Sequence, residues 1–432
     1  MPRPDTLPRH VRINDVAEGY VKLVLAVGQH DVDFVDAYYG PEAWRPSAEV
    51  KARPMHDLRA DAARLIDAVA TAENRERGQE GDGERAASDL LELRREYLTR
   101  QLQAVDARLR MLAGERFTFD EESRALYDAV APVHDESYFA RTLSELDLRI
   151  SGPGPLSTRH EAFKRAFIIP RDRLDAVFRT AIDACRTRTR QHLALPADER
   201  FTVEYVTGKA WSGYNWYHGH ATSVIQVNTD LPIYIDRAAD LAAHEGYPGH
   251  HVYNALLEAH LVHARGWVEF SVYALFSPQS LIAEGTANFG IDVAFPGADR
   301  VAFERETLFP LAGLDPARAG EYYETMALTE RLAYAGNEAA RRYVNGRISR
   351  SEAADWLETY ALQPRARAEQ RVRFFDQYRS YVINYNLGKD LVSAYIESQG
   401  GTAADPERRW RVFGELLASP RLPSGLRVAP QD

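Results

Sequence analysis

The stretch LAAHEGYPGHHVYNALL, from Leu241 to Leu257, constrains this chain more than any other. It carries three histidines and a glutamate, and apolar residues flank them on both sides. These flanks predict that the stretch is buried or lines a cleft. Ionisable side chains in such a setting are costly unless they bind something. A metal ion bound by the histidines is therefore the first interpretation to consider.

The spacing of the histidines does not match the familiar zinc signature. That signature places two histidines four residues apart on one helix, with a glutamate beside the first. Here His250 follows His244 by six positions and His251 follows it by seven. On an unbroken helix the sixth position points roughly 120° away from the first. A regular helix would therefore prevent His244 from sharing an ion with either neighbour.

Pro248 and Gly249 change this expectation. Proline lacks an N–H and clashes with the carbonyl four positions back, whereas glycine accepts backbone angles closed to other residues. The pair predicts a bulge or kink in the helix. If two residues are looped out, His250 reaches the register of a second ligand; if three are, His251 does. The smaller distortion favours His250, with His251 as the alternative, and Glu245 keeps its position as general base.

A catalytic zinc site needs a third protein ligand and an open position for water. The best candidate is Glu284, the only acid in the helical stretch LIAEGTANFG from Leu281 to Gly290. Asn288 lies one turn after Glu284 and Asp240 one turn before His244, so either could hold a ligand in place. A solvated helix acid is the alternative interpretation of Asp240. We expect one zinc ion, although histidine and carboxylate ligands also suit iron, cobalt and nickel.

The motif HEGYPGHH followed by an AEG helix resembles a bacterial family catalogued as domain of unknown function 885. That family is similar to gluzincin metallopeptidases, whose mostly helical members include Taq-type carboxypeptidase and thimet oligopeptidase. The resemblance implies that His244, either His250 or His251, and Glu284 bind the metal. It also implies that Glu245 is the base.

The resemblance extends weakly to a Tyr-x-x-Gly-Lys segment at Tyr385–Lys389. Two positions depart from the related patterns. Gluzincins often have aspartate four residues after the ligand glutamate, where this chain has Asn288. The family often has glutamine shortly after the double histidine, where this chain has Tyr253 and Asn254. These departures bear on the substrate class more than on metal binding.

Other polar residues suit a hydrolase. The hydroxyl of Tyr385 could stabilise a tetrahedral oxyanion, and Arg379 or Lys389 could pair with a substrate carboxylate. Packing in a helical core is the alternative for the Tyr385 segment. The alternating stretch from Val224 to Asn228 predicts an edge strand that pairs with the substrate backbone, and Asn228 is a candidate substrate-binding residue. A purely structural strand is equally compatible with that pattern.

The overall pattern predicts a mainly α-helical fold with a small β-sheet beside the metal-binding helix. Residues 1–200 read as a helical N-terminal lobe, and the glycine-rich, charged run 73–85 as the loop of a helical hairpin. Residues 201–432 read as the metal-site lobe, beginning with a sheet of two to four strands over 201–228. The two lobes are expected to form one continuous body around a cleft.

Composition excludes several classes of protein. A formal net charge of −10 argues against nucleic acid as a partner, and no apolar run is long enough to span a membrane. Cys185 is the only cysteine, so no intrachain disulfide is possible. The start of the chain has no apolar signal core, and a cytoplasmic location is expected.

Taken together, these features predict a zinc-dependent hydrolase that cleaves amide bonds in peptides, with Glu245 as general base. One alternative is an amidase or deacylase that acts on a small acylated amino acid. Another is a metal-containing binding protein without turnover, in which the Pro-Gly insertion has spoiled the catalytic geometry. The expected partner is thus a peptide or a small amide.

Overall fold

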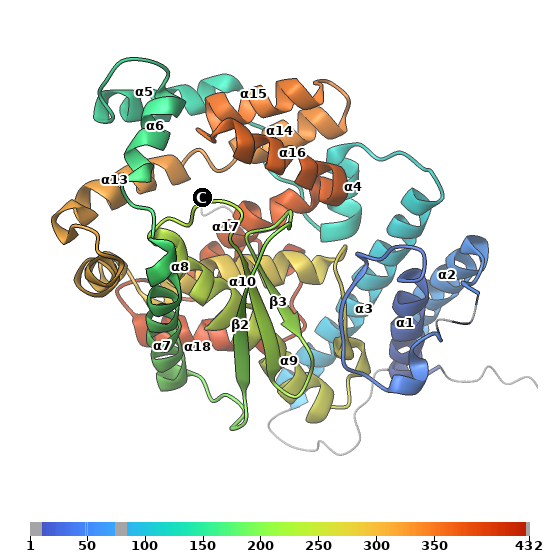
Figure 1. Cartoon of the computed structure of the whole chain (residues 1–432). Helices are drawn as coiled ribbons and strands as arrows, with labels where there is room; N and C mark the ends of the chain where they lie inside the picture. The colour runs from blue at the N-terminus through green and yellow to red at the C-terminus, as the bar shows by residue number, and fades with distance from the viewer. Residues whose placement is uncertain (1–10, 48, 50, 74–83, 429–432) are drawn as a thin grey trace, which may run out of the picture.

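The computed structural model describes residues 11–428 except 48, 50 and 74–83. The fold is mainly α-helical with little β-structure, as the sequence predicted (Figure 1). The first half of the chain, up to residue 200, contributes one short strand, β1 (Val35–Tyr38), and seven α-helices: α1 (Ile13–Val27), α2 (Met55–Thr71), α3 (Glu84–Leu112), α4 (Phe119–Tyr127), α5 (Glu136–Arg149), α6 (Leu156–Arg165) and α7 (Leu174–His192).

The rest of the chain starts with a sheet and returns to helices. Its strands are β2 (Arg200–Val206), β3 (Gly213–Tyr217), β4 (Thr222–Asn228) and β5 (Val272–Ala274). Its α-helices are α8 (Asp236–Leu241), α9 (His250–Leu257), α10 (Pro278–Ala294), α11 (Asp299–Phe303), α12 (Phe309–Ala312), α13 (Ala319–Glu330), α14 (Ala335–Val344), α15 (Arg350–Tyr360), α16 (Arg365–Tyr378), α17 (Ile383–Ser398) and α18 (Pro406–Leu417).

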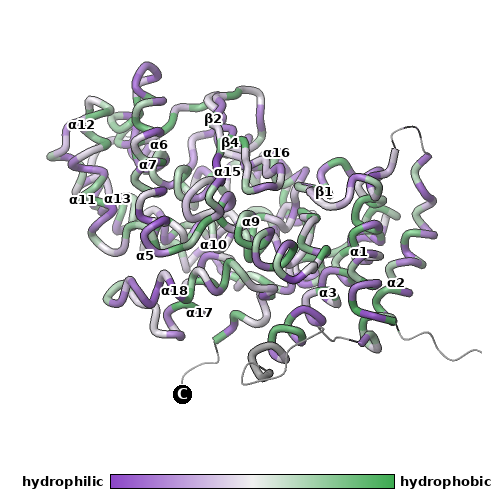
Figure 2. The backbone as a smooth tube through the Cα atoms, turned by 90° about the horizontal axis from the view of Figure 1, so that it is seen from below, coloured by the Kyte–Doolittle hydropathy of each residue, from purple (hydrophilic) through white to green (hydrophobic). Residues whose placement is uncertain are grey.

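Segments from both sides of residue 200 pack together. Strand β1 pairs antiparallel with β5, and helices α3 and α4 contact α10. The predicted hairpin helices α2 and α3 do contact each other, whereas most of the loop predicted over 73–85 lies outside the described residues. Peripheral helices such as α2 and α7 alternate between apolar and polar residues along their length, as burial of one face requires (Figure 2).

The three-stranded sheet has the order β2–β4–β3. Strand β4 runs parallel to β2 and antiparallel to β3, so it is the central strand. The prediction that Val224–Asn228 forms an edge strand was therefore wrong. The sequence alternation of an edge strand and of a half-buried central strand is the same, and only the pairing of β2, which comes earlier in the chain, distinguishes them. Strand β3 is the edge beside the candidate site.

Helix α10 lies in the middle of the molecule and is buried along nearly its whole length (Figure 1). It crosses α17 with backbone against backbone at Gly285 and Gly388. A Cβ atom at Gly285 would lie 2.5 Å from the carbonyl oxygen of Gly388, well inside van der Waals contact. This crossing therefore needs glycine, and it holds the residue before Gly285 next to the aromatic residues of α17.

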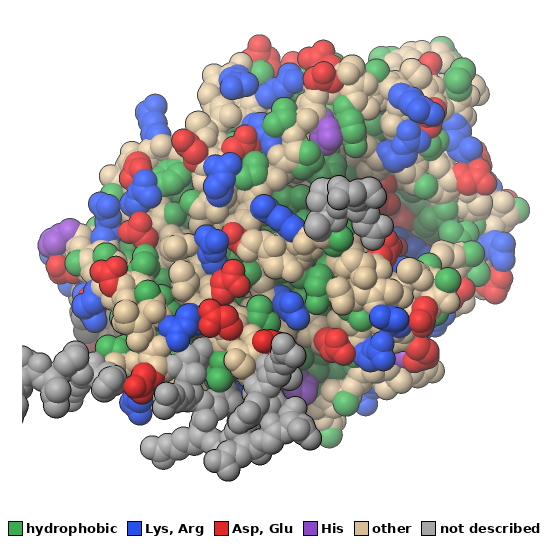
Figure 3. All heavy atoms as spheres, turned by 180° about the vertical axis from the view of Figure 1, so that it is seen from behind, with side chains coloured by type: hydrophobic (Ala, Val, Ile, Leu, Met, Phe, Trp, Pro, Cys, Tyr) green, Lys and Arg blue, Asp and Glu red, His purple; other side chains and the backbone are tan. Residues whose placement is uncertain are grey.

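On the face shown in Figure 3, acidic and basic side chains are interspersed without a continuous basic tract. No described helix is both long enough and apolar enough to cross a membrane.

We predict that Gly285→Ala destabilises the protein by about 1–3 kcal/mol, because the added methyl group overpacks the crossing of α10 and α17. Gly320→Ala in α13 is the matched control, since no atom lies within 4 Å of the added Cβ. That control should change stability by less than about 1 kcal/mol and in the stabilising direction. Denaturant unfolding followed by circular dichroism measures both. Equal stability of the two variants would contradict the role assigned to the crossing.

Candidate metal centre

A widened helical turn joins the two halves of the HEGYPGHH motif. Residues Ala242–Gly246 form a π-helical turn. The N–H of Tyr247 donates to the carbonyl of Ala242, five residues back, and the N–H of Gly249 donates to the carbonyl of Ala243, six residues back, at 2.8 Å. The turn thus holds two residues more than an α-helical turn. This is the smaller of the two distortions that the sequence allowed.

Only glycine fits at position 249. A Cβ atom there would lie 1.9 Å from the carbonyl oxygen of His244 and 2.4 Å from that of Ala243. The close approach lets the chain restart as helix α9 directly over the preceding turn. As a result, the first residue of α9, His250, lies beside His244.

Three ligand atoms converge at this point. The Nε2 atoms of His244 and His250 lie 3.2 Å apart. The Oε2 atom of Glu284, on α10, lies 3.4 Å from Nε2 of His244 and 3.8 Å from Nε2 of His250. A tetrahedral zinc ion with bonds of about 2.0–2.2 Å places its ligand atoms about 3.3–3.6 Å from one another. The triangle therefore has the size that one zinc ion requires.

The Oε2 atom of Glu284 provides an independent test of this fit. It is buried and accepts no hydrogen bond, whereas Oε1 accepts one from the hydroxyl of Tyr381 at 2.9 Å. An unsatisfied buried carboxylate oxygen is costly, and a cation between it and the two imidazoles would satisfy it. The residues present therefore fit a zinc ion held by His244, His250 and Glu284.

The pKa values reflect the crowding of these groups. Burial by itself lowers the pKa of His244, but the carboxylates of Glu284 and Glu245 outweigh it and raise that pKa to about 9. Burial by itself raises the pKa of Glu284, but the two imidazoles bring it below its ordinary value. In the absence of a metal, a proton shared by these groups would supply the positive charge.

Glu245 is next to His244 and is 4% exposed. Its Oε1 atom lies 4.0 Å from Nε2 of His244, and it lines the same cavity. Burial raises the pKa of Glu245, and the neighbouring histidines oppose this only in part. Asn215 of the edge strand β3 donates its amide to the carbonyl oxygen of Glu245 at 2.7 Å, which fixes the backbone there. A raised carboxylate pKa suits a general base.

His251 points away from the cluster. Its Nδ1 atom lies 2.8 Å from the hydroxyl of Ser223, and its Nε2 atom lies 3.1 Å from Oε2 of Glu199. The three residues have the composition of a nucleophilic triad, but each is at most 2% exposed, so no substrate can reach the serine. The structure thus favours His250 over His251 as a ligand, and His251 ties α9 to the sheet.

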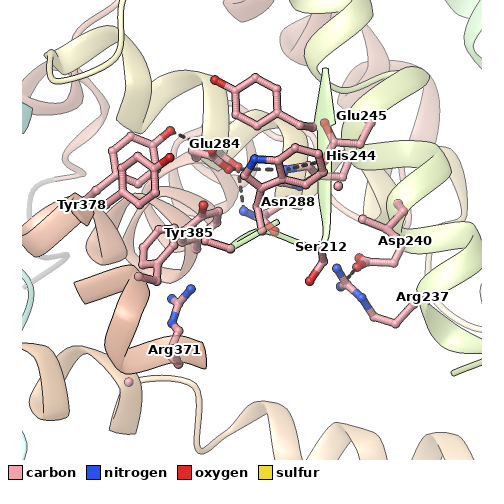
Figure 4. A pocket seen from close by; sticks show the side chains of 18 of the residues that line it. Ser212, Arg237, Asp240, His244, Glu245, Glu284, Asn288, Arg371, Tyr378 and Tyr385 are labelled. Atoms are coloured by element: carbon pink, nitrogen blue, oxygen red, sulfur yellow. Dashed lines mark hydrogen bonds and ion pairs between the residues drawn. The ribbon is translucent and has the colours of Figure 1, made fainter. Parts of the chain in front are cut away.

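The cluster lies in a cavity of 480 Å³ (Figure 4). Edge strand β3 and the loop before it form one wall of the cavity. Residues of helices α16 and α17 form another wall. Asp36 of β1 also reaches the cavity and accepts a hydrogen bond from the hydroxyl of Tyr214. Burial raises the pKa of Asp36 to about 6. Sequence reasoning missed Asp36, because it is far from the motif in the chain.

Tyr385 and Tyr381 both line the cavity, and the hydroxyl that donates to Glu284 belongs to Tyr381, one turn before Tyr385. The two rings have centroids 5.8 Å apart. The aromatic spacing in this segment was visible in the sequence, yet nothing local indicated which ring faces α10.

Three predicted substrate-binding residues do not line the cavity. Arg379 pairs with the buried carboxylate of Glu122 at 2.6 Å. Lys389 lies 2.8 Å from Glu330 and 3.2 Å from Asp292. The amide of Asn228 donates to the backbone carbonyls of Lys209 and Trp211. These placements argue against a direct role in substrate binding, because each polar group is already satisfied by the fold.

The two supporting residues also differ in detail from expectation. The Asn288 amide donates to the backbone carbonyl of Glu284 at 2.9 Å, so it steadies the helix rather than the carboxylate. Asp240 pairs with Arg237 at the cavity wall and acts on His244 only through its charge.

We predict that His250→Ala abolishes stoichiometric zinc binding, because it removes one corner of the ligand triangle. The matched variant His251→Ala should retain one zinc per chain but unfold at a lower temperature, because it leaves Glu199 and Ser223 without their partner. Metal analysis after dialysis, together with thermal unfolding, separates the two. Loss of zinc from the His251 variant alone would assign the ligand to the other histidine.

The solved structures similar to this chain include two described as lipoproteins. One is a "putative lipoprotein" from Colwellia psychrerythraea, at 13% identity and a TM-score of 0.49, covering 89% of this chain and 69% of that chain. The other is a "putative lipoprotein of unknown function" from Shewanella oneidensis, at 13% identity and a TM-score of 0.40, covering 83% of this chain and 72% of that chain. No family model and no curated protein matches the chain.

Proposed function

We propose that this protein is a zinc-dependent hydrolase that cleaves amide bonds, with peptides as the main substrate class. The observation that carries the proposal is the convergence of His244, His250 and Glu284 on one point of a cavity wall, with Glu245 beside it. The resemblance of HEGYPGHH to domain of unknown function 885 and to gluzincin peptidases supports the same chemistry.

A zinc ion, when bound, would supply a Lewis acid and lower the pKa of water in its open coordination position. The protein supplies the proton transfers. Glu245 accepts a proton from the attacking water and then passes it to the leaving amine. Its buried position suits both steps, because a raised pKa makes a carboxylate a better base and its conjugate acid a usable donor near neutral pH.

The tyrosines of the α17 region have complementary roles in this proposal. Burial keeps the pKa of both Tyr381 and Tyr385 well above the ordinary value, so both hydroxyls remain protonated and can donate. Tyr381 donates to Glu284 and orients it. Tyr385 is free to donate to the oxyanion that forms when water attacks the scissile carbonyl.

Strand β3 suits an extended substrate. It is the edge of its sheet among the described strands, and Gly213, Tyr214 and Asn215 line the cavity. An edge strand offers unpaired backbone groups, which can pair with a peptide of varied sequence. This feature favours a peptide over a compact small amide.

We predict that Glu245→Gln retains its zinc and loses activity by a factor of about 10²–10⁴, because the amide cannot accept the proton. The measurement is peptide hydrolysis by zinc-loaded protein, before and after treatment with a chelator and after zinc is restored. A binding protein without turnover would show no metal-dependent hydrolysis in the unmodified chain.

We also predict that Tyr385→Phe lowers kcat by about 10²–10³ and leaves KM nearly unchanged, because the hydroxyl would act only as charge develops on the oxygen. Steady-state kinetics on one peptide test this. Tyr378→Phe, at another ring of the same cavity, is the control and should have a much smaller effect. A similar loss in both variants would point to damaged packing instead.

A further inference from the structure

Two arginines on helix α16 line the cavity and make no ion pair with any described residue. Arg367 and Arg371 are one helical turn apart, and both line the cavity. In the described part of the chain, neither side chain makes an ion pair or a hydrogen bond. Their neighbour Arg365, on the same helix, contacts three carboxylates: Asp355, Glu358 and Glu369. Helix α16 therefore carries one arginine that is fully paired on the surface, and two arginines at the cavity that have no ion-pair contact.

The surroundings of Arg371 leave its hydrogen-bonding groups available. Its guanidinium carbon lies 4.5 Å from the ring centroid of Phe374 and 5.4 Å from that of Tyr385. Contacts with ring faces stabilise the charge but do not use the N–H groups, which lie in the guanidinium plane. In Figure 4 the guanidinium of Arg371 points into the cavity, toward Tyr385. Burial lowers the pKa of both arginines, which reflects the cost of keeping them charged there.

Several other charged groups of the cavity have partners within the chain. Arg237 pairs with Asp240, Asp36 accepts a hydrogen bond from Tyr214, and Glu284 faces the two imidazoles. Like charges one turn apart on a helix repel each other. Two such cations without a counter-ion are best explained by an anion that arrives with the substrate.

The position of Arg371 relative to the candidate metal centre limits how far the anionic group of the substrate can be from the bond that is cleaved. Tyr385 contacts both Arg371 and the ring of Tyr381, and Tyr381 donates to Glu284. Successive contacts therefore link the arginine to a candidate metal ligand, and all four side chains line the same cavity. In a carboxyl-terminal residue, only one carbon separates the α-carboxylate from the nitrogen of the last amide bond. A carboxyl-terminal residue therefore places its anionic group close to the scissile bond.

We propose that Arg371, assisted by Arg367, binds the terminal carboxylate of the substrate, so that the amide bond cleaved is the one next to a free carboxyl end. The substrate class is peptides with a free carboxyl terminus and, by the same chemistry, N-acylated amino acids. The cleavage part of this inference rests on the proposed hydrolase function, whereas the recognition of a carboxylate does not. A single carboxylate suits the cavity better than a phosphate dianion, which Asp36 and Glu245 would repel.

The test compares one short N-acetylated peptide in two forms, with a free carboxyl terminus and with a terminal amide. Binding is measured by calorimetry on zinc-loaded Glu245→Gln protein, and hydrolysis on the unmodified protein. We expect the free acid to bind about 10–100-fold more tightly than the amide, and kcat/KM to differ in the same sense. A third peptide, amidated at its end but carrying a glutamate side chain there, distinguishes a terminal carboxylate from an acidic side chain.

Arg371→Gln supplies the second arm of the test. It should raise KM for the free acid at least tenfold, leave the amide unchanged and alter kcat little. Arg373→Gln is the matched control, because Arg373 lies on the same helix with an exposed side chain, and it should behave as the unmodified protein does. Circular dichroism and zinc content verify the fold. If the Arg371 variant does not fold, Arg367→Gln replaces it, with a smaller shift expected in the same direction.

The two proposals fail separately. Preferential binding of the free acid without any hydrolysis would overturn the hydrolase function and keep the carboxylate site. Equal binding and cleavage of the acid and the amide would overturn the carboxylate site and keep the hydrolase. Absence of binding by either form, preference for the glutamate side chain, or an equal loss for acid and amide in the Arg371 variant would also overturn it.

Discussion

The candidate metal centre depends on bringing two imidazole nitrogens and a buried carboxylate oxygen within 3.8 Å of one another. Such a cluster is unstable without a positive charge at its centre. A proton can supply that charge, and the raised pKa of His244, about 9, indicates that the metal-free protein holds one. A metal ion must displace this proton to bind. Proton binding and metal binding therefore compete at this cluster.

Backbone contacts, rather than side-chain packing, set the positions of the three candidate ligands. Gly249 lets the chain pass against the carbonyl of His244, which brings His250 round to the first histidine. Gly285 lets α10 and α17 touch, which places Glu284 under Tyr381. In both places a single methyl group would separate elements that must be in contact. A close-packed interior cannot absorb such a shift, so the geometry of the site is coupled directly to the fold.

The part of this site that follows from local chain geometry could be predicted from the sequence. The effect of Pro248 and Gly249 on helix register depends only on neighbouring residues. From this effect the sequence predicted a bulge or kink and favoured His250 over His251. The helical class followed similarly from the period of the apolar residues. The prediction that Glu284 is a ligand was weaker, because it required two segments far apart in the chain to meet. The only sequence signal was that Glu284 is the single acid among small and apolar neighbours.

The roles of the charged residues could not be predicted in this way. From the sequence, Arg379 and Lys389 were candidates for binding a substrate carboxylate. Their actual partners are Glu122 for Arg379, and Asp292 and Glu330 for Lys389, and all three are distant in the chain. The central position of β4 depended on a parallel partner, β2, whose pairing leaves no local mark. In each case the sequence shows that a group can bind something, while the tertiary fold decides whether that capacity is already used.

In the folded protein, a charged group that binds a ligand differs from a structural one in having no partner of opposite charge within the chain. A buried structural charge can be satisfied by the chain itself, as in the pair of Arg94 and Glu269, whose Nε and Oε1 atoms are 2.6 Å apart. In the cavity, by contrast, the buried Oε2 atom of Glu284 accepts no hydrogen bond, and Arg367 and Arg371 line the wall without an ion pair to any described residue. The carboxylate of Glu284 would be stabilised by a cation beside the histidines. The guanidinium groups of α16 would be stabilised by an anion. A fold retains such local costs where a ligand removes them, and a bound metal together with a carboxylate-bearing substrate would remove both at once.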